Sequence, residues 1–226
     1  MKFFLCDIDD TLFPSNEFSN LARKNAITAL LRMGIKQRKE KIETDLKEII
    51  EKEGSNSSNH FDLLCKKYKI KEPGKFIAAA VAAYHDTKTT ISPFPFVQIA
   101  LLKMREQGIK VYALTNGNSV KQWDKLIRLQ ISFFFDGVFV SSDLGREKDK
   151  VFFEKVLKKI NANGNECIMI GDRENSDIVP AKKTGIKTIK FKSGKFKDEK
   201  TSADYKTDSW EEVLEIVQSL KTQLKK

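Results

Sequence analysis

The stretch Phe3-Phe4-Leu5-Cys6-Asp7-Ile8-Asp9-Asp10-Thr11-Leu12 decides the fold of this chain. The apolar residues 3–6 predict a short strand that is buried on both faces. Asp7 and Asp9 follow it, and side chains two apart in an extended segment share a face, so the two carboxylates are expected to point the same way. Ligands of open α/β sheets bind at the carboxyl ends of the strands. The Asp-x-Asp-x-Thr pattern therefore predicts a functional site, with a solvated acidic turn or a helix N-cap as the alternative.

Two carboxylates held this close repel each other unless a cation or a shared proton compensates them. A divalent metal with oxygen ligands supplies that compensation, and Mg²⁺ is the usual ion where phosphate is also bound. The pair Asp7 and Asp9 thus predicts a magnesium site.

Length and composition predict a globular protein. The chain has 226 residues, of which 40% are hydrophobic, enough for one large domain or a domain with a sizeable insertion. No apolar run approaches the roughly 20 residues of a membrane span. Asp7 interrupts the first apolar run, so the N-terminus lacks a signal-peptide pattern and we expect a cytoplasmic protein. Cys6, Cys65 and Cys167 have neither zinc nor disulfide spacing, which predicts buried thiols in a reducing compartment.

The formal net charge is +10. A basic balance suits nucleic-acid binding, and it also attracts small anionic substrates. The lysines are spread along the chain, with higher density at 187–200 and at 225–226. The chain has no RNA-binding signature and no zinc-finger spacing, so exposed, solvated lysines are the preferred interpretation.

Short apolar runs alternate with amphipathic segments along most of the chain. Further strands are predicted at 111–114, 138–140, 167–170 and 188–191, and helices at 96–107, 121–129, 152–160 and 210–224. Strands that alternate with helices predict a parallel sheet with helices on both faces. The expected fold class is a doubly wound, Rossmann-like α/β core.

Residues 14–92 break this alternation and are expected to be helical throughout. Helices are predicted at 18–33, 37–51, 61–67 and 75–84, with a polar loop at 54–59. The first should present an apolar stripe formed by Phe18, Leu21, Ala22, Ala26, Ala29, Leu30 and Met33. Pro93-Phe94-Pro95 marks the return to the core. We therefore assign 1–13 and 93–226 to the core domain and 14–92 to a helical cap above the Asp7 and Asp9 crevice.

Polar residues also follow the other predicted strands. They are Thr115 with Asn116, a lysine near position 148, and Asp172 with Asp177. Taken alone, Thr115-Asn116-Gly117 is also compatible with a plain strand-to-helix turn, and Asp172 with a helix N-cap.

Three motifs in this order resemble the haloacid dehalogenase-like hydrolase superfamily, in its subgroup with an α-helical cap. They are Asp-Ile-Asp-Asp-Thr at 7–11, Leu-Thr-Asn-Gly at 114–117 and Gly-Asp-Arg-Glu-Asn-Ser-Asp at 171–177. The stretches 21–26, 59–62, 83–88 and 120–129 are similar to an archaeal-type group of Mg²⁺-dependent phosphatases. That group includes enzymes regarded as glyceraldehyde 3-phosphate phosphatases.

The resemblance implies roles for the acidic residues. Asp7 would be the nucleophile that forms an aspartyl-phosphate, and Asp9 the general acid and base. Mg²⁺ would be held by the carboxylates of Asp7 and Asp172 and by the backbone carbonyl of Asp9. Asp177 would lie in this ligand set or just behind it.

The resemblance also implies a phosphate-binding set made of the Thr115 hydroxyl, the Asn116 amide and a lysine. The superfamily's usual Lys-Pro pair is absent from Gly145-Arg146-Glu147-Lys148-Asp149-Lys150. Lys148 is the better candidate for this lysine, and Lys150 is the alternative. The two histidines, His60 and His85, are expected at the surface or in cap packing, with His85 and Tyr84 as candidate substrate contacts.

The leading hypothesis is a Mg²⁺-dependent phosphatase for a small phosphorylated metabolite. A sugar-phosphate phosphotransferase or mutase would use the same residues, and a basic nucleic-acid-binding protein is the alternative outside enzymes. The resemblance suggests glyceraldehyde 3-phosphate as the substrate, with other triose phosphates, phosphoglycolate and nucleotides open. A homodimer is compatible with the resemblance, although the sequence contains no interface signal.

Overall fold

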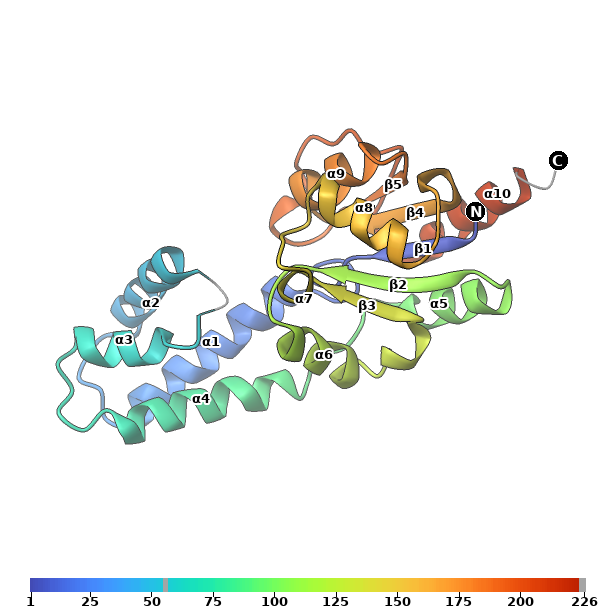
Figure 1. The fold of residues 1–226 in the computed structure, drawn as a ribbon. Coiled ribbons are helices and arrows are strands. Elements are labelled where there is room, and N and C mark those ends of the chain that lie inside the picture. The colour runs from blue at the N-terminus through green and yellow to red at the C-terminus, as the bar shows by residue number, and fades with distance from the viewer. Residues whose placement is uncertain (55–56, 224–226) are drawn as a thin grey trace. The chain divides into compact units, whose positions relative to one another are not determined.

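The computed structural model describes residues 1–54 and 57–223 and divides the chain into two compact units. The first unit combines residues 1–16 with the chain from residue 92 onward, and the second comprises residues 17–91. Figure 1 draws both units. Residues 55 and 56 of the expected polar loop, Leu224 of the expected last helix, and the Lys225-Lys226 end lie outside the described residues.

The first unit is built on a six-stranded sheet in which all neighbouring strands are parallel, in the order β3-β2-β1-β4-β5-β6. The strands are β1 (Phe3–Cys6), β2 (Lys110–Thr115), β3 (Gly137–Val140), β4 (Cys167–Gly171), β5 (Lys187–Phe191) and β6 (Tyr205–Thr207). The predicted α/β fold class is confirmed. The five predicted strands are also confirmed, and they correspond to β1, β2, β3, β4 and β5. The short strand β6 was not predicted, because three residues containing an exposed lysine give no apolar run.

Helices cover both faces of this sheet (Figure 1). They are α5 (Val97–Glu106), α6 (Ser119–Arg128), α7 (Ser141–Leu144), α8 (Lys150–Lys159), α9 (Val179–Lys182) and α10 (Trp210–Gln223). Alternating residues of β1 reach opposite faces. Phe3 and Leu5 lie in the core cluster with residues of α8, whereas Phe4 packs edge-to-face against Trp210 of α10 at 6.2 Å between ring centroids. Burial on both faces explains why β1 reads as an unbroken apolar run.

In its described residues, 17–54 and 57–91, the second unit contains four helices. They are α1 (Ser15–Arg32, which begins in the first unit), α2 (Lys39–Glu53), α3 (His60–Lys67) and α4 (Gly74–Lys88). Its core contains residues from all four. The predicted stripe on α1 is partly wrong, because Leu21 is 46% exposed and Met33 is 39% exposed. The buried face of α1 carries Ala22, Ala26 and Leu30, which are spaced four residues apart. Leu21 is exposed because it lies about 100° around the helix from Ala22. Met33 is exposed because it follows Arg32, the last residue of the helix.

Asp45 of α2 is a fully buried carboxylate that ties α2 to α3. It receives hydrogen bonds from Lys41 and the Tyr68 hydroxyl, both at 2.8 Å, and an ion pair from Lys67 at 2.6 Å. Although burial opposes ionisation, these partners lower the pKa of Asp45 to about 2. Asp45→Ala should therefore reduce the free energy of unfolding by about 3 kcal/mol in urea denaturation. Glu51→Ala, which removes an exposed pair at 3.9 Å on the same helix, should change it by less than about 0.5 kcal/mol.

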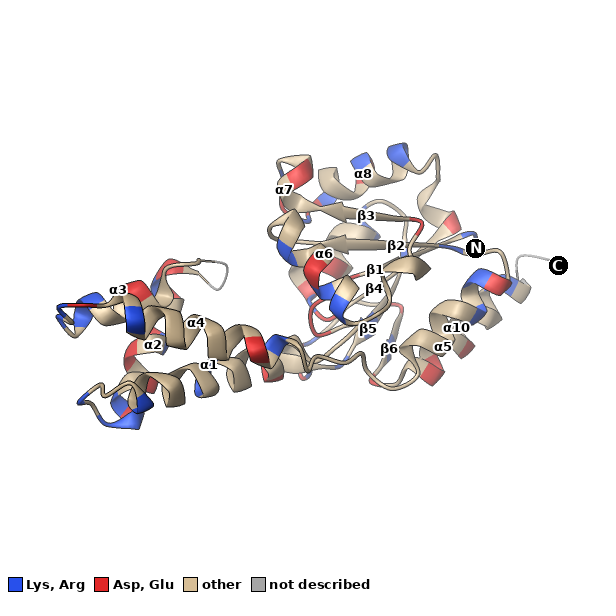
Figure 2. Cartoon of the chain, turned by 90° about the horizontal axis from the view of Figure 1, so that it is seen from below, with Lys and Arg blue, Asp and Glu red and all other residues tan. Residues whose placement is uncertain are grey.

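Among the described residues, none of the helices combines the length and the apolar character needed to cross a membrane. Basic and acidic side chains are interspersed along the helices of both units (Figure 2). The three cysteines are buried and free, as expected for small apolar side chains.

Candidate active site

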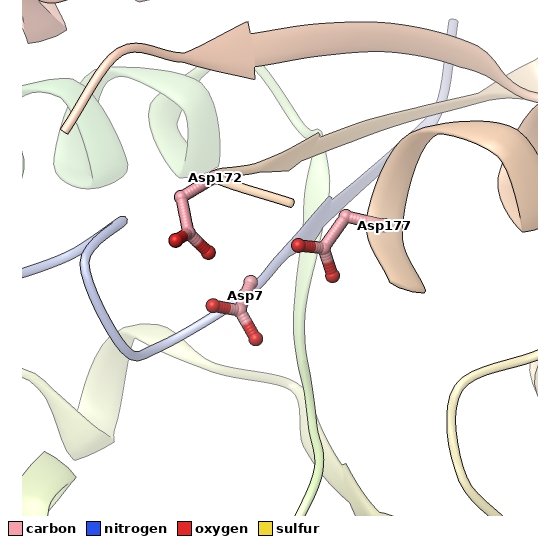
Figure 3. A group of neighbouring side chains, drawn as sticks. All are labelled: Asp7, Asp172 and Asp177. Carbon is pink, nitrogen blue, oxygen red and sulfur yellow. The ribbon is translucent and has the colours of Figure 1, made fainter. Parts of the chain in front are cut away.

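Three carboxylates converge at the carboxyl ends of β1 and β4 (Figure 3). Asp7 follows β1, Asp172 follows β4, and Asp177 belongs to the helical turn η3 (Glu174–Ile178). One oxygen from each lies within 4.8 Å of the others, and all three residues are buried. The backbone N–H of Asp7 donates to the carbonyl of Ile170 at 3.0 Å, so the sheet itself brings the first two together.

Asp177 reaches the cluster because of the residues that precede it. A side chain on Gly171 would place its Cβ 2.4 Å from Cγ of Asp177, so only glycine allows this carboxylate to approach the end of β4. The backbone N–H of Arg173 donates to Asp177 Oδ2 at 3.0 Å, which fixes the carboxylate on its own turn.

Lys148 is the only ammonium that the described residues bring into direct contact with this cluster. Its Nζ pairs with Asp7 Oδ1 and, at 2.5 Å, with Asp177 Oδ1, and it donates to the carbonyl of Leu114 at 3.3 Å. Burial would lower the pKa of Lys148, but Asp177 and Asp7 outweigh it and raise that pKa. Lys150 instead pairs with Glu154 at 3.2 Å on the exposed face of α8. The structure thus brings Lys148, rather than Lys150, to the carboxylates.

Three carboxylates and one ammonium leave the cluster short of positive charge. Burial, opposed by Lys148, raises the pKa of Asp7 to about 7. Burial together with the Asp7 and Asp177 charges raises the pKa of Asp172 to about 9. Asp172 Oδ2 is buried and has no hydrogen-bond partner among the described residues. A divalent cation would neutralise the crowded carboxylates and bind the buried oxygen that lacks a partner. The donor set of oxygen atoms therefore fits Mg²⁺.

Thr115 is the last residue of β2, and Asn116 follows it, next to the segment that carries Lys148. Thr115 is buried, and its hydroxyl donates to the Asn116 carbonyl at 3.3 Å. Asn116 Oδ1 accepts the backbone N–H of Lys148 at 2.8 Å, so one side chain fixes the segment that carries the lysine. Sequence spacing could not reveal this link between residues far apart in the chain.

Asp9 lies apart from the three clustered carboxylates. Both of its oxygens accept hydrogen bonds from Lys125 of α6, at 2.7 and 2.6 Å. Burial would raise the pKa of Asp9, but the Lys125 ammonium outweighs burial and lowers it. Asp9 is therefore an ionised carboxylate at rest. Sequence reasoning overlooked Lys125, because a lysine in a lysine-rich amphipathic helix has the pattern of a solvated residue.

The loop that carries Asp9 is anchored on both sides. Asp10 adopts a left-handed conformation with φ 53°, and its side chain accepts the backbone N–H of Asn16 at 3.0 Å. The indole N–H of Trp210 donates to the carbonyl of Thr11 at 3.0 Å. The Thr11 hydroxyl donates to Asp7 Oδ2 at 3.4 Å. These contacts hold the polypeptide between β1 and α1 in one conformation.

The turn that carries Asp172 and Asp177 is also anchored, by Glu174. Its carboxylate accepts hydrogen bonds from the hydroxyls of Thr201 and Ser202, both at 2.6 Å. Its backbone N–H donates to Glu199 at 3.2 Å, and Glu199 pairs with the buried Lys190 of β5 at 3.0 Å. These anchors were not predicted either.

The two histidines lie in the second unit, away from the residues just described along the chain. The His60 ring contacts the carbonyl of Gly54 at 2.9 Å. The His85 ring packs edge-to-face on Tyr84, with 6.1 Å between ring centroids. Neither belongs to the carboxylate cluster.

Comparison with known proteins places this geometry in a family. A family model described as haloacid dehalogenase-like hydrolase matches residues 4–191. The chain belongs to the haloacid dehalogenase-like hydrolase family. It is 38% identical to the glyceraldehyde 3-phosphate phosphatase of Methanopyrus kandleri, over 97% of this chain and 98% of that protein. It is 36% identical to the protein of the same name from Methanocaldococcus jannaschii, over 98% and 99%.

Solved structures agree on the fold of this haloacid dehalogenase-like protein. A putative β-phosphoglucomutase from Thermotoga maritima superimposes with a TM-score of 0.75 at 18% identity, covering 97% of this chain and 99% of that one. The putative haloacid dehalogenase-like hydrolase YfnB from Bacillus subtilis, bound to magnesium, gives 0.66 at 21% identity, with 96% and 98% covered. The expected enzyme class, a phosphoric monoester hydrolase, agrees with the family and with the names of the archaeal relatives.

Proposed function

We propose that this protein is a Mg²⁺-dependent phosphatase that hydrolyses a small phosphorylated metabolite through an aspartyl-phosphate on Asp7. The observation that carries the proposal is the buried cluster of Asp7, Asp172 and Asp177 around Lys148. A buried site that holds one ammonium and has room in its charge balance for a divalent cation suits phosphoryl transfer, in which catalysis consists mainly of positioning and charge stabilisation.

The carboxylates of Asp7 and Asp172 and the backbone carbonyl of Asp9 would hold the metal. Asp177 would lie in this set or immediately behind it, where its bond from Arg173 orients it. When bound, Mg²⁺ supplies charge neutralisation for the phosphoryl oxygens and a fixed point for the substrate.

The first chemical step breaks the substrate's phosphate ester. Asp9 takes up a proton from solvent as the substrate binds, because it is ionised in the free protein. A carboxylate oxygen of Asp7 then attacks phosphorus, the bond from phosphorus to the leaving oxygen breaks, and that oxygen takes the proton from Asp9. In the second step Asp9, now a carboxylate, takes a proton from water. The water oxygen attacks phosphorus and the bond to Asp7 breaks, which releases phosphate and restores both residues.

Thr115, Asn116 and Lys148 would bind the phosphoryl oxygens during both steps. The backbone of Lys148 is fixed by Asn116, and its ammonium already contacts Asp7. The ammonium therefore needs no rearrangement to contact a phosphoryl group on Asp7. Preorganised donors of this kind stabilise charge that develops in the transition state.

Glyceraldehyde 3-phosphate is the substrate we propose. Support comes from the two archaeal relatives of that name, which match almost the whole of this chain. Three buried free cysteines fit a cytoplasmic location. That the helical unit of residues 17–91 serves as a substrate-selecting cap stays a prediction.

The substrate assignment is tested by phosphate release from purified protein with Mg²⁺. The substrates to compare are glyceraldehyde 3-phosphate, dihydroxyacetone phosphate, phosphoglycolate and nucleoside monophosphates. We expect kcat/KM for glyceraldehyde 3-phosphate to exceed the others by about 10-fold or more, a difference of about 1.4 kcal/mol in transition-state binding. Turnover of a sugar phosphate to an isomer without phosphate release would favour the mutase alternative. Salt-sensitive retention of nucleic acid without any turnover would contradict both enzyme hypotheses.

Metal binding should stabilise the fold, and more strongly at higher pH. The pKa values of Asp7 (about 7) and Asp172 (about 9) are raised above their ordinary value, so the folded, metal-free protein binds more protons than the unfolded chain. The stability that protonation provides is complete below about pH 4 and is lost as pH rises toward 9. Mg²⁺ binds the deprotonated carboxylates and compensates that loss. In thermal denaturation, the increase in Tm caused by Mg²⁺ should be larger at pH 9 than at pH 6.

The matched control for this titration is Asp172→Asn. It removes the negative charge of one carboxylate of the cluster and replaces one of its oxygens with an amide nitrogen, so most of the Mg²⁺-dependent increase in Tm should disappear. EDTA should abolish phosphate release by the wild-type protein. An equal Mg²⁺ effect at both pH values, retained in Asp172→Asn, would contradict this metal site.

A further inference from the structure

The contacts of Lys125 with Asp9 and Gln122 use every N–H donor of the lysine ammonium. An ammonium carries three N–H donors and no acceptor. Two acceptors are the two carboxylate oxygens of Asp9, at 2.7 and 2.6 Å, and the third is the Gln122 side-chain oxygen at 3.2 Å. Lys125 is therefore fully engaged with its neighbours.

Gln122 fixes this arrangement to the rest of the site. It is 3% exposed, and its amide nitrogen donates to the backbone carbonyl of Asn116 at 2.8 Å. At the start of α6, the Asn118 side chain caps the helix by accepting the N–H of Lys121 at 3.2 Å. The helix that carries Lys125 is thus held against the end of β2, where the phosphate-binding residues lie.

Asp9 needs such a support, because its carboxylate has to serve two reacting atoms in turn. Asp9 lies beyond the end of β1, and its side chain is 31% exposed, so packing alone leaves it freedom to rotate. An ammonium that binds both oxygens restricts this rotation. Each oxygen keeps lone pairs for a further contact, and proton transfer demands a carboxyl held within hydrogen-bond distance of the reacting oxygen.

We infer that Lys125 is a positioning residue that, together with Gln122, aims the Asp9 carboxylate at the leaving oxygen and then at the attacking water. This inference rests on the proposed function. Lys125 touches Asp9 and Gln122, so it acts through Asp9 and does not itself contact the reacting atoms.

The test uses two substrates that differ in how much their leaving oxygen needs a proton. p-Nitrophenolate leaves readily without protonation, whereas the alkoxide of glyceraldehyde 3-phosphate does not. Lys125→Met should lower kcat for glyceraldehyde 3-phosphate by about 100-fold, within the range of general acid–base catalysis. KM should stay nearly unchanged. The rate of the first p-nitrophenolate release, measured in a single turnover, should fall far less than that of the first release from glyceraldehyde 3-phosphate, because the second step is common to both substrates. Lys125→Arg, which keeps the charged contact, should restore most of the activity.

A double-mutant cycle completes the test. If Lys125 acts through Asp9, then Lys125→Met should cause little further loss in an Asp9→Asn background. The matched control is Lys158→Met, which replaces an exposed lysine of α8 and should leave both activities unchanged. Thermal denaturation of each variant checks that it is folded.

Several outcomes would overturn the inference. They are equal losses in the single-turnover rate with both substrates, a rise in KM instead of a fall in kcat, or losses that add fully to that of Asp9→Asn. Failure of the proposed function would look different, because the wild-type protein itself would then release no phosphate from either substrate.

Discussion

Asp7→Asn is expected to abolish phosphate release from glyceraldehyde 3-phosphate and from p-nitrophenyl phosphate alike. The amide cannot attack phosphorus. We expect no other carboxylate to replace it, because Asp172, which follows β4, and Asp177 of η3 enter the cluster from other elements (Figure 3). Loss of a nucleophile costs about 10⁴-fold or more in kcat. A steady-state phosphate assay with Mg²⁺ measures the effect. Activity within about 10-fold of wild type would rule out Asp7 as the nucleophile.

The same variant should remain folded. Burial raises the pKa of Asp7, so its charged form is costly in the folded protein, and a neutral amide removes that cost. Lys148 keeps Asp177 and the Leu114 carbonyl as partners. We therefore expect a Tm in EDTA at pH 8 that is no lower than that of wild type. Asp62→Asn, at an exposed position on α3, serves as the matched control with full activity.

Lys148→Met is expected to have the second-largest effect. The apolar side chain fills much of the same space but leaves three buried carboxylates without their ammonium. Loss of a preorganised charge that faces the phosphoryl group should reduce kcat by about 10³-fold. Removing one partner of a buried pair should also lower the free energy of unfolding in EDTA by about 3 kcal/mol. Phosphate release and urea denaturation measure the two effects.

Lys150→Met provides the matched comparison, two residues along the chain. Lys150 makes an exposed pair with Glu154 at 3.2 Å, and such pairs contribute little. This variant should keep its activity and its stability within about 0.5 kcal/mol. If Lys150→Met lost activity and Lys148→Met kept it, the assignment of the active-site lysine would have to be reversed.

The sequence predicted those parts of the molecule that depend on local patterns. Residues 3–6 form β1 because an apolar run that ends on charged residues suits a strand covered on both faces. Asp7 and Asp172 could be placed at the carboxyl ends of strands, and the carboxyl ends of parallel strands lie at one edge of a sheet. Because the usual Lys-Pro pair is absent at 145–150, the sequence left both Lys148 and Lys150 as candidates. The contacts of the Lys148 ammonium with Asp7 and Asp177 distinguish the two lysines.

The contacts that the sequence did not predict join residues far apart in the chain. Asp9 and Lys125 are separated by 116 residues, and no spacing rule relates them. Gln122 and Lys125 look like ordinary members of a polar helix face. The sequence also did not predict the three-residue strand β6 or the exposure of Leu21. Both depend on how the chain packs in three dimensions, which local sequence patterns do not describe.

The most direct test of the central claim is to trap the covalent intermediate. The wild-type protein is mixed with glyceraldehyde 3-phosphate and Mg²⁺, quenched within one turnover and reduced with borohydride, which converts an aspartyl-phosphate into homoserine. Peptide mass spectrometry then locates the modified residue. We expect homoserine at position 7, dependent on substrate and on Mg²⁺. Rapid phosphate release with position 7 unmodified, or with the modification at position 9, 172 or 177, would contradict the proposed mechanism.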